Sequence, residues 1–421
     1  MSRSDRSQPA HFRRNFAAFM ADYVFFSVAF SFADTGTVMP SFVGMMTDSK
    51  PIIGLVGTIF AGAWLIPQLG AATVLNRQQR KKPALMAAVY SGRPLFFILA
   101  ALIWAGLTRH PEVMLTVFFT LIGVFSVLDG IASVAWFDIL ARAVPVTRRG
   151  RLLGVSQLLS GVLGVVIARL VEIILVHPAL PFPSNYALLF ALAAVAFIPS
   201  AVALALLKEP EEELVNQERL SLREQLKELV TLWRGDPTFR QLMASRWLTG
   251  LMDLSVSFYV LHAVTLFGIS QGRLLAARTV GSIVASLGLG WLSDRRGPLP
   301  VIRVGSLTAL GSPLLAMGLH LFVSPTLPQA EWIYLAVYFL LGFTLNSRML
   351  GHFNYVLEMA PEGKRPLYIG LSSTLTGVLV PASFLGGVLL QVTSYPVLFG
   401  ITAACIVGGV VASFKLRRSV E

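Results

Sequence analysis

Residues 154–163 read GVSQLLSGVL and residues 370–379 read GLSSTLTGVL, so six of the ten positions are identical at an offset of 216. The likeness extends upstream, where a proline and an arginine precede each copy at the same spacing: Pro145 and Arg149, then Pro361 and Arg365. The chain has 421 residues, so the copies lie half its length apart. We infer that the two halves arose as a repeat and share one local structure.

The composition places this repeat in a lipid bilayer. Hydrophobic residues make up 55% of the chain and charged residues 13%, with a mean hydropathy of +0.70, which is too apolar for a soluble domain. Twelve apolar runs have about the 20 residues that a helix needs to cross the hydrocarbon core. They lie near 16–38, 52–75, 84–107, 112–140, 152–176, 185–207, 241–267, 272–293, 300–323, 332–357, 366–391 and 394–414.

These runs predict an all-α membrane protein, because they are continuous rather than alternating and lipid supplies no partner for an open strand. The two repeat copies begin the fifth and eleventh spans. Six spans separate them, an even number, so the halves have the same orientation and form two six-helix bundles related by a pseudo-two-fold axis along the membrane normal. We therefore expect bundles at 1–207 and 241–421. The polar linker 208–240 carries a capping box at Ser221 and Glu224 and is expected to contain an amphipathic helix on the membrane surface.

The net charge of +12 reflects topology rather than nucleic-acid binding. If the N-terminus is cytoplasmic, 25 of the 34 lysines and arginines lie in the arms and loops on that side, as the positive-inside rule predicts. We expect a multi-pass protein of the cell membrane with both termini cytoplasmic and the first span retained. The single Cys405 excludes an intramolecular disulfide and a cysteine metal cluster.

One loop carries a recognisable motif. Residues 290–300 read GWLSDRRGPLP, and this stretch resembles the G-x-L-[SAG]-D-R-x-G-R-[RK] signature of the major facilitator superfamily. The corresponding earlier loop, ATVLNRQQRKKP at 72–83, keeps Arg77 but has Asn76 where the acid belongs. The later loop lacks the trailing basic pair.

The resemblance implies that these loops latch one access state at the cytoplasmic face. Asp294 would then accept hydrogen bonds from N–H groups that begin a neighbouring span, whereas the alternative is that the arginines serve topology alone. The candidate residues for the gate and signature loops are Asn76, Arg77, Asp138, Arg149, Gly290, Asp294, Arg295, Gly297, Glu358 and Arg365.

The resemblance also implies that the first, fourth, seventh and tenth spans line a central cavity. An ionisable side chain at mid-bilayer costs about 2.5–3.5 kcal/mol and is expected to face a cavity or a partner. The charged and amide side chains on these four spans are the candidate proton-coupling and cavity residues: Asp22, Asp34, Asp129, Arg246, Asp253, Asn346 and Arg348.

Asp253 is the first candidate for a proton carrier and Asp129 the second. Arg246, Gly250 and Asp253 are spaced i, i+4, i+7 and share one face of a continuous helix. Arg348 is expected to act as counter-charge or as a clamp for a substrate anion. Two alternatives stay open for this group, namely a static salt bridge between helices and direct binding of substrate.

These features predict a secondary active transporter that moves a small organic solute by alternating access, coupled to protons. Multidrug or metabolite efflux by the same fold, or a non-transporting receptor or lipid scramblase, are the alternatives. An enzyme is not expected, since the sequence contains neither H-E-x-x-H nor C-x-x-C nor a phosphate-binding G-x4-G-K. We expect no cofactor, no metal and a monomer in the bilayer, and we expect His262 and His352 to pack or hydrogen-bond.

Overall fold

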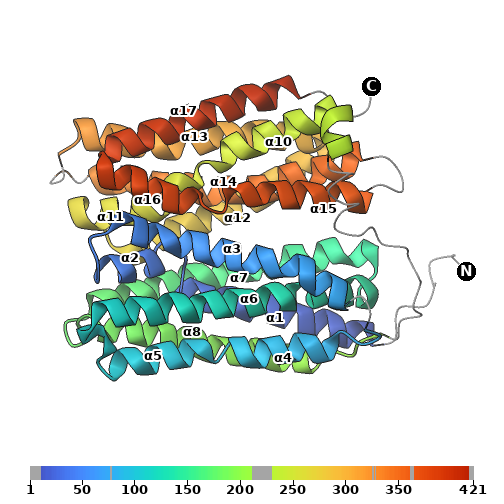
Figure 1. Cartoon of the computed structure of the whole chain (residues 1–421), viewed down its shortest axis with the longest axis horizontal. Helices are drawn as coiled ribbons and strands as arrows, with labels where there is room; N and C mark the ends of the chain where they lie inside the picture. Colours follow the sequence, from blue (N-terminus) through green and yellow to red (C-terminus); the bar gives the residue numbers. More distant parts are fainter. Residues whose placement is uncertain are drawn as a thin grey trace, which may run out of the picture. The chain divides into compact units, whose positions relative to one another are not determined.

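The computed structural model describes residues 11–75, 78–210, 230–324, 327, 329–360 and 365–416. Across these ranges every regular element is a helix, and twelve spans are long and apolar enough to cross a membrane (Figure 1). The prediction of an all-helical membrane protein with twelve spans is therefore confirmed. The amphipathic helix predicted around Ser221 and Glu224 lies outside the described residues.

The chain divides into two compact units. The first comprises Met1–Thr47 and Ile59–Val215, and the second comprises Asp48–Thr58 and Asn216–Glu421. The division differs from the predicted boundaries at the start of the second span, whose first residues belong to the second unit. The reason is close packing within that unit, since a Cβ at Gly54 would lie 2.3 Å from the carbonyl oxygen of Ser383.

The helices of the first unit pack around α1, which lies against α7 and α8, while α6 lies against α4 and α5. Their bounds are α1 (Phe12–Phe32), α2 (Val38–Gly44), α3 (Lys50–Leu75, shared with the second unit), α4 (Lys82–Gly92), α5 (Leu95–Trp104), η1 (Leu107–Arg109), α6 (Pro111–Ala143), α7 (Val146–Val176) and α8 (Ser184–Ala205).

In the second unit α14 is central and packs against α12 and α13, while α17 packs against α10 and α13. The bounds are α10 (Pro237–Gly250), α11 (Asp253–Phe267), α12 (Gln271–Arg296), α13 (Pro298–Phe322), α14 (Gln329–Met359), α15 (Arg365–Thr376), η2 (Gly377–Leu379), α16 (Ala382–Val392) and α17 (Tyr395–Lys415).

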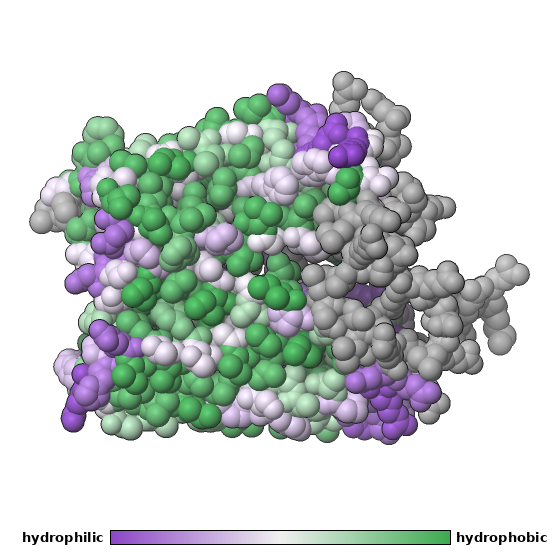
Figure 2. Space-filling model, in the orientation of Figure 1, coloured by the Kyte–Doolittle hydropathy of each residue, from purple (hydrophilic) through white to green (hydrophobic). Residues whose placement is uncertain are grey.

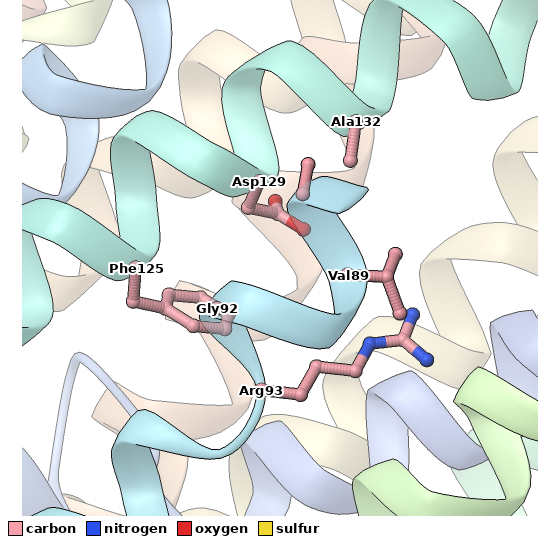
Figure 3. Close-up of a pocket in the computed structure, with 7 residues that line it drawn as sticks. Val89, Gly92, Arg93, Phe125, Asp129 and Ala132 are labelled. Carbon is pink, nitrogen blue, oxygen red and sulfur yellow. The ribbon is translucent and has the colours of Figure 1, made fainter. Parts of the chain in front are cut away.

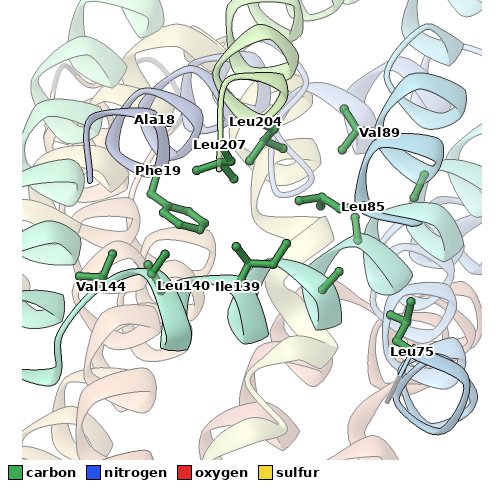
Figure 4. Close-up of a cluster of buried hydrophobic side chains, with 14 of the residues drawn as sticks. Ala18, Phe19, Leu75, Leu85, Val89, Ile139, Leu140, Val144, Leu204 and Leu207 are labelled. Carbon is green, nitrogen blue, oxygen red and sulfur yellow. The ribbon is translucent and has the colours of Figure 1, made fainter. Parts of the chain in front are cut away.

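An apolar cluster holds one end of the first unit together. Phe19 of α1, Leu85 of α4, Ile139 of α6 and Leu204 of α8 meet in it and are at most 1% exposed (Figure 4). Outside such clusters the helices present large apolar side chains such as Ile66, Leu287 and Val378, and hydrophilic residues gather near the helix ends (Figure 2). An apolar exterior between polar ends is what a bilayer requires.

Three spans are interrupted. The third breaks between α4 and α5 at Arg93 and Pro94, because a proline has no N–H to donate to the helix. The seventh breaks between α10 and α11, where the amide of Met252 bonds to the carbonyl of Thr249, an i to i+3 turn in place of the i to i+4 bond. The eleventh breaks at η2, just before Pro381.

The end of the first span corrects one prediction. Asp34 lies beyond the last residue of α1, and its Oδ1 accepts from the amide of Gly36 at 2.9 Å and from Thr37 Oγ1 at 3.0 Å. These are the bonds of an aspartate that shapes a turn before the next helix. Asp34 therefore organises the entry into α2 and is not part of the first membrane span.

Candidate functional site

The first unit contains a buried ion pair. Asp22 of α1 is 5% exposed, and its Oδ1 lies 3.0 Å from Nη2 of Arg93. Ser200 Oγ of α8 donates to the same oxygen at 2.5 Å, and the indole N–H of Trp136 on α6 donates to Oδ2 at 2.8 Å. Three donors from three elements thus satisfy the carboxylate, and this arrangement favours a structural role for Asp22 over a proton carrier.

Arg93 was not among the site residues predicted from the sequence. It stands at the break in the third span, where the guanidinium lies over the rings of Phe26 and Phe197 at 5.9 and 5.6 Å. Its partner Asp22 is 71 positions away in the sequence. The sequence did indicate this pair indirectly. Asp22 and Arg93 are an acid and a base in the middle of different spans, and each of these charges needs a counter-ion in lipid.

A small pocket lies beside this ion pair. Figure 3 shows Phe125, Asp129 and Ala132 projecting from α6, opposite Val89, Gly92 and Arg93 at the end of α4. The indole N–H of Trp64 on α3 donates to Asp129 Oδ2 at 3.0 Å. Among the described residues Asp129 has no salt-bridge partner within 4.0 Å, so it is a half-buried carboxylate held by one neutral donor.

The second unit contains the ion pair that joins the seventh and tenth spans. Nη1 of Arg348 on α14 donates to both oxygens of Asp253 on α11, at 3.1 and 3.3 Å, and Nη2 approaches Oδ2 at 3.4 Å. The two side chains are 19% and 33% exposed, respectively. This partial exposure leaves the pair open to exchange with solvent or solute. The prediction that Arg348 is a counter-charge for Asp253 is consistent with this geometry.

Arg246 and His352 border this pair. A Cβ at Gly250 would lie 3.3 Å from Nη2 of Arg348, so the absent side chain makes room for the guanidinium. Arg246 is half-buried one turn before Gly250, and its electrostatic neighbour is Arg348. His352 is 2% exposed and lies one helical turn after Arg348, under the influence of both arginines. The break at Met252 means that these residues come from α10, α11 and α14 rather than from one straight helix and its neighbour.

The other cavity candidate is Asn346, whose Oδ1 accepts from Ser286 Oγ of α12 at 3.3 Å. This bond ties α14 to α12 and is a packing contact.

The signature loop follows α12. Gly297 has φ 78° and ends the helix, and a Cβ there would lie 3.8 Å from Glu358 at the end of α14. Asp294 is exposed and makes no hydrogen bond or ion pair with any residue in the described ranges, and the guanidinium of Arg295 lies 4.5 Å above the ring of Trp291. At Gly290 a Cβ would meet nothing within 4 Å. The latch predicted for Asp294 remains a prediction.

The corresponding end of the first unit carries a charge network. Asp138 of α6 accepts from Lys81 at 2.5 Å and from Arg142 at 2.7 Å, and Arg142 also donates to Glu209 at 2.9 Å. Arg149 donates to the carbonyl of Val144 at 2.9 Å and so caps the end of α6. Asn76, Arg77 and the side chain of Arg365 lie outside the described residues.

A histidine cluster in the second unit was not foreseen as a group. His262 of α11 is fully buried, and its ring hydrogen-bonds with the hydroxyl of Tyr334 on one side and with His320 Nδ1 at 2.8 Å on the other. The prediction that His262 hydrogen-bonds is confirmed. The sequence offered no sign of the partners, which come from α13 and α14.

Solved structures of transport proteins share this fold. The nucleoside transporter NupG superposes with a TM-score of 0.64 at 13% identity, covering 96% of this chain and 99% of that one. A bacterial homologue of the iron transporter ferroportin, inward-facing, gives 0.67 at 13% identity over 97% and 99%. A variant of the Escherichia coli fucose:proton symporter FucP gives 0.58 at 14% identity over 96% and 98%.

The curated relatives are uncharacterized proteins from Mycobacterium tuberculosis and Mycobacterium bovis, 27% identical over 344 residues. The match covers 79% of this chain and 64% of the relatives, so the chain spans about two thirds of their length. The family model described as the Major Facilitator Superfamily matches residues 24–327.

The twelve candidate membrane spans and the fold define a helical multi-pass membrane protein that shares its architecture with solved transport proteins. The family match covers more than half of the chain. The protein belongs to the major facilitator superfamily.

Proposed function

We propose that this protein is a secondary active transporter that moves a small organic solute by alternating access and couples that movement to protons. Family membership supports solute transport, and the ion pair between Asp253 and Arg348 is the observation that supports coupling. It joins the seventh and tenth spans through side chains that are partly exposed. In a low-dielectric environment such a pair is strong when both groups are charged and is lost when one is neutralised.

The proposed cycle follows from that property. A proton that binds to Asp253 removes the negative charge, and Arg348 then loses its three charge-assisted contacts with the carboxylate. The α11 and α14 helices are no longer held together at that point, and the guanidinium is free for another partner. Release of the proton to the opposite side restores the ion pair. Asp129, which has a neutral donor in place of a cation, is the second candidate for carrying the proton.

The test is proton movement in proteoliposomes that contain a pH-sensitive dye. A library of organic solutes is added outside, and a solute that is transported with protons changes the internal pH. Wild-type protein is expected to respond to at least one solute, and Asp253→Asn is expected to abolish that response because an amide cannot take up the proton.

Glu331→Gln is the matched control. Glu331 is also paired with an arginine, Arg273, but at an exposed end of α14, so this variant should respond like the wild type. Normal solute-driven proton movement in Asp253→Asn would contradict the assignment of Asp253. Solute flux that ignores an imposed pH gradient would contradict proton coupling as a whole.

A further inference from the structure

We propose that Arg246 and Arg348 form a binding site for an organic carboxylate, and that this is the substrate class of the transporter. As a statement about substrate, the inference rests on the proposed function, whereas binding itself does not depend on transport. The site lies within the second unit, on α10 and α14.

The first observation is an imbalance of charge. Arg348 is paired with Asp253, but Arg246 makes no hydrogen bond and no ion pair with any residue in the ranges that the structure describes. Its electrostatic neighbour is a second cation, Arg348. Among the described residues the two guanidinium groups thus have a single carboxylate partner, Asp253, which pairs with Arg348. An uncompensated cation there is unfavourable unless an anion or water reaches it, so the site favours an anion that contacts both arginines.

The second observation is a buried polar side chain without satisfied bonds. His352 is 2% exposed. The carbonyl of Arg348 lies near its ring, but neither ring nitrogen forms a hydrogen bond with a described residue. A buried polar group that is left unsatisfied lowers the stability of the fold. A neutral imidazole beside two guanidinium groups has an N–H to offer, and an anion that enters between the arginines would meet it.

The form of the site favours a carboxylate. A guanidinium presents parallel N–H donors that match the two oxygens of a carboxylate. Arg348 already binds one in this way, because Nη1 donates to Oδ1 of Asp253 at 3.1 Å and Nη2 donates to Oδ2 at 3.4 Å. The side chain of Asp253 therefore occupies the position that a substrate carboxylate would take. The apolar Leu379 also packs against Gly250, next to Arg348, and gives the site a nonpolar neighbour for the organic part.

Exchange between the two carboxylates links substrate to proton. When Asp253 takes up a proton, it gives up Arg348, and the substrate carboxylate can accept the same N–H donors. When the substrate leaves, Asp253 loses its proton and pairs with Arg348 again. One proton and one negative charge enter together and leave together, so the net charge of the site is unchanged through the cycle.

The experiment measures equilibrium binding to purified protein, because neutral benzoic acid crosses bilayers unaided and would obscure a flux assay. Benzoate, hexanoate and 1-naphthoate are each compared with their own carboxamide by ligand-dependent thermal stabilisation and by calorimetry. At least one carboxylate is expected to bind at least tenfold more tightly than its amide. Arg246→Gln should weaken that binding about tenfold or more, which is the usual loss for one charged hydrogen bond.

Arg303→Gln is the matched control. Arg303 is a membrane-span arginine of the same unit, but it donates to the carbonyl of Leu416 at 3.1 Å and is distant in sequence from the site. This variant should retain the affinity of the wild type. Phenyl phosphate is included as a separate arm, and tighter binding of it than of benzoate would overturn the carboxylate assignment.

Three further outcomes would overturn the inference: no carboxylate in the set binds, the amides bind equally well, or Arg246→Gln binds like the wild type. These results are distinct from failure of the proposed function. Carboxylate binding by a protein that moves no protons would contradict coupled transport and leave the anion site in place. Proton-coupled transport of a neutral solute, without binding of carboxylates, would contradict the anion site and leave the proposed function in place.

Discussion

At the scale of single residues, the two ion pairs are alike in chemistry and different in setting. The pair of Asp22 and Arg93 is almost fully buried and has further donors from Ser200 and Trp136, whereas the pair of Asp253 and Arg348 is partly exposed. A buried ion pair whose hydrogen bonds are all made is rigid, and removal of one partner leaves the other charge buried and uncompensated. Partial exposure leaves a contact that solvent or solute can exchange. We therefore expect the first pair to serve structure and the second to serve function.

Loss of the buried carboxylate should destabilise the protein. Asp22→Asn leaves the Arg93 guanidinium buried without its counter-charge, and we expect a loss of about 3–5 kcal/mol in the free energy of unfolding. Denaturant titration in detergent micelles measures it. The double variant Asp22→Leu with Arg93→Leu should recover part of the loss, because no isolated charge remains. The exposed pair of Arg273 and Glu331 provides the control. Glu331→Gln should lower the free energy of unfolding by no more than about 1 kcal/mol. A single Asp22→Asn variant as stable as the wild type would refute the structural role.

Asp129 should respond differently from Asp22. An asparagine at this position keeps an oxygen for the indole of Trp64 and removes a half-buried charge that has no salt-bridge partner in the described part of the chain. We expect Asp129→Asn to change the free energy of unfolding by less than about 1 kcal/mol. The same titration checks this expectation. A loss as large as that of Asp22→Asn would indicate that Asp129 compensates Arg93 across the pocket.

At the scale of helices, glycines set the distance between α12 and α14. A Cβ at Gly281 would lie 2.0 Å from the carbonyl oxygen of Phe339, and a Cβ at Gly342 would lie 1.9 Å from that of Arg278. Each helix thus packs its backbone directly against the other, as small residues allow in membranes. This contact helps to position α14, which carries Arg348 and His352.

A methyl group at this crossing should separate the helices. We expect Gly281→Ala to cost about 1–3 kcal/mol, the usual penalty for overpacking, and to lower the melting temperature measured by differential scanning fluorimetry. Gly288 lies two turns further along α12, where a Cβ would meet nothing within 4 Å. Gly288→Ala should therefore be neutral or stabilise by up to about 1 kcal/mol. Equal effects of the two substitutions would show that the close approach is not needed.

The interrupted spans also matter at this scale. The turn at Leu251 and Met252 separates α10 from α11 and falls between Arg246 and Asp253. The sequence spacing alone predicted one continuous face. The break places the two residues on separate helices, and Arg348 pairs with Asp253. In the eleventh span η2 and Pro381 separate α15 from α16.

At the scale of the whole molecule, charge distribution predicts orientation. The chain has 34 lysines and arginines, of which 25 lie at the ends and in the loops assigned to the cytoplasm. The repeat copies lie in α7 and in α15 with η2, one in each unit, as the repeat predicted. The even number of candidate spans in the described part of the chain predicts that both termini lie on one side of the membrane.

Cysteine labelling tests this orientation. In a Cys405→Ser background, His110→Cys and Arg80→Cys each provide one exposed thiol, in the loops before α6 and α4. A membrane-impermeant maleimide applied to intact cells should label His110→Cys and leave Arg80→Cys unlabelled until the membrane is permeabilised. The opposite pattern would invert the predicted topology and, with it, the assignment of the signature loop to the cytoplasmic side.

The sequence by itself determined the class of the protein and the positions of its spans. The reason is that the thickness of the bilayer requires about 20 consecutive apolar residues in each spanning helix, which can be recognised along the chain. It also marked the costly ions, since a charge in lipid is conspicuous wherever it stands. Only the tertiary structure decided which ions meet. Arg93 pairs with Asp22 across 71 positions and Arg348 with Asp253 across 95. Partner choice depends on how each helix is rotated and where it breaks, and those features come from packing contacts between distant segments that no local pattern encodes.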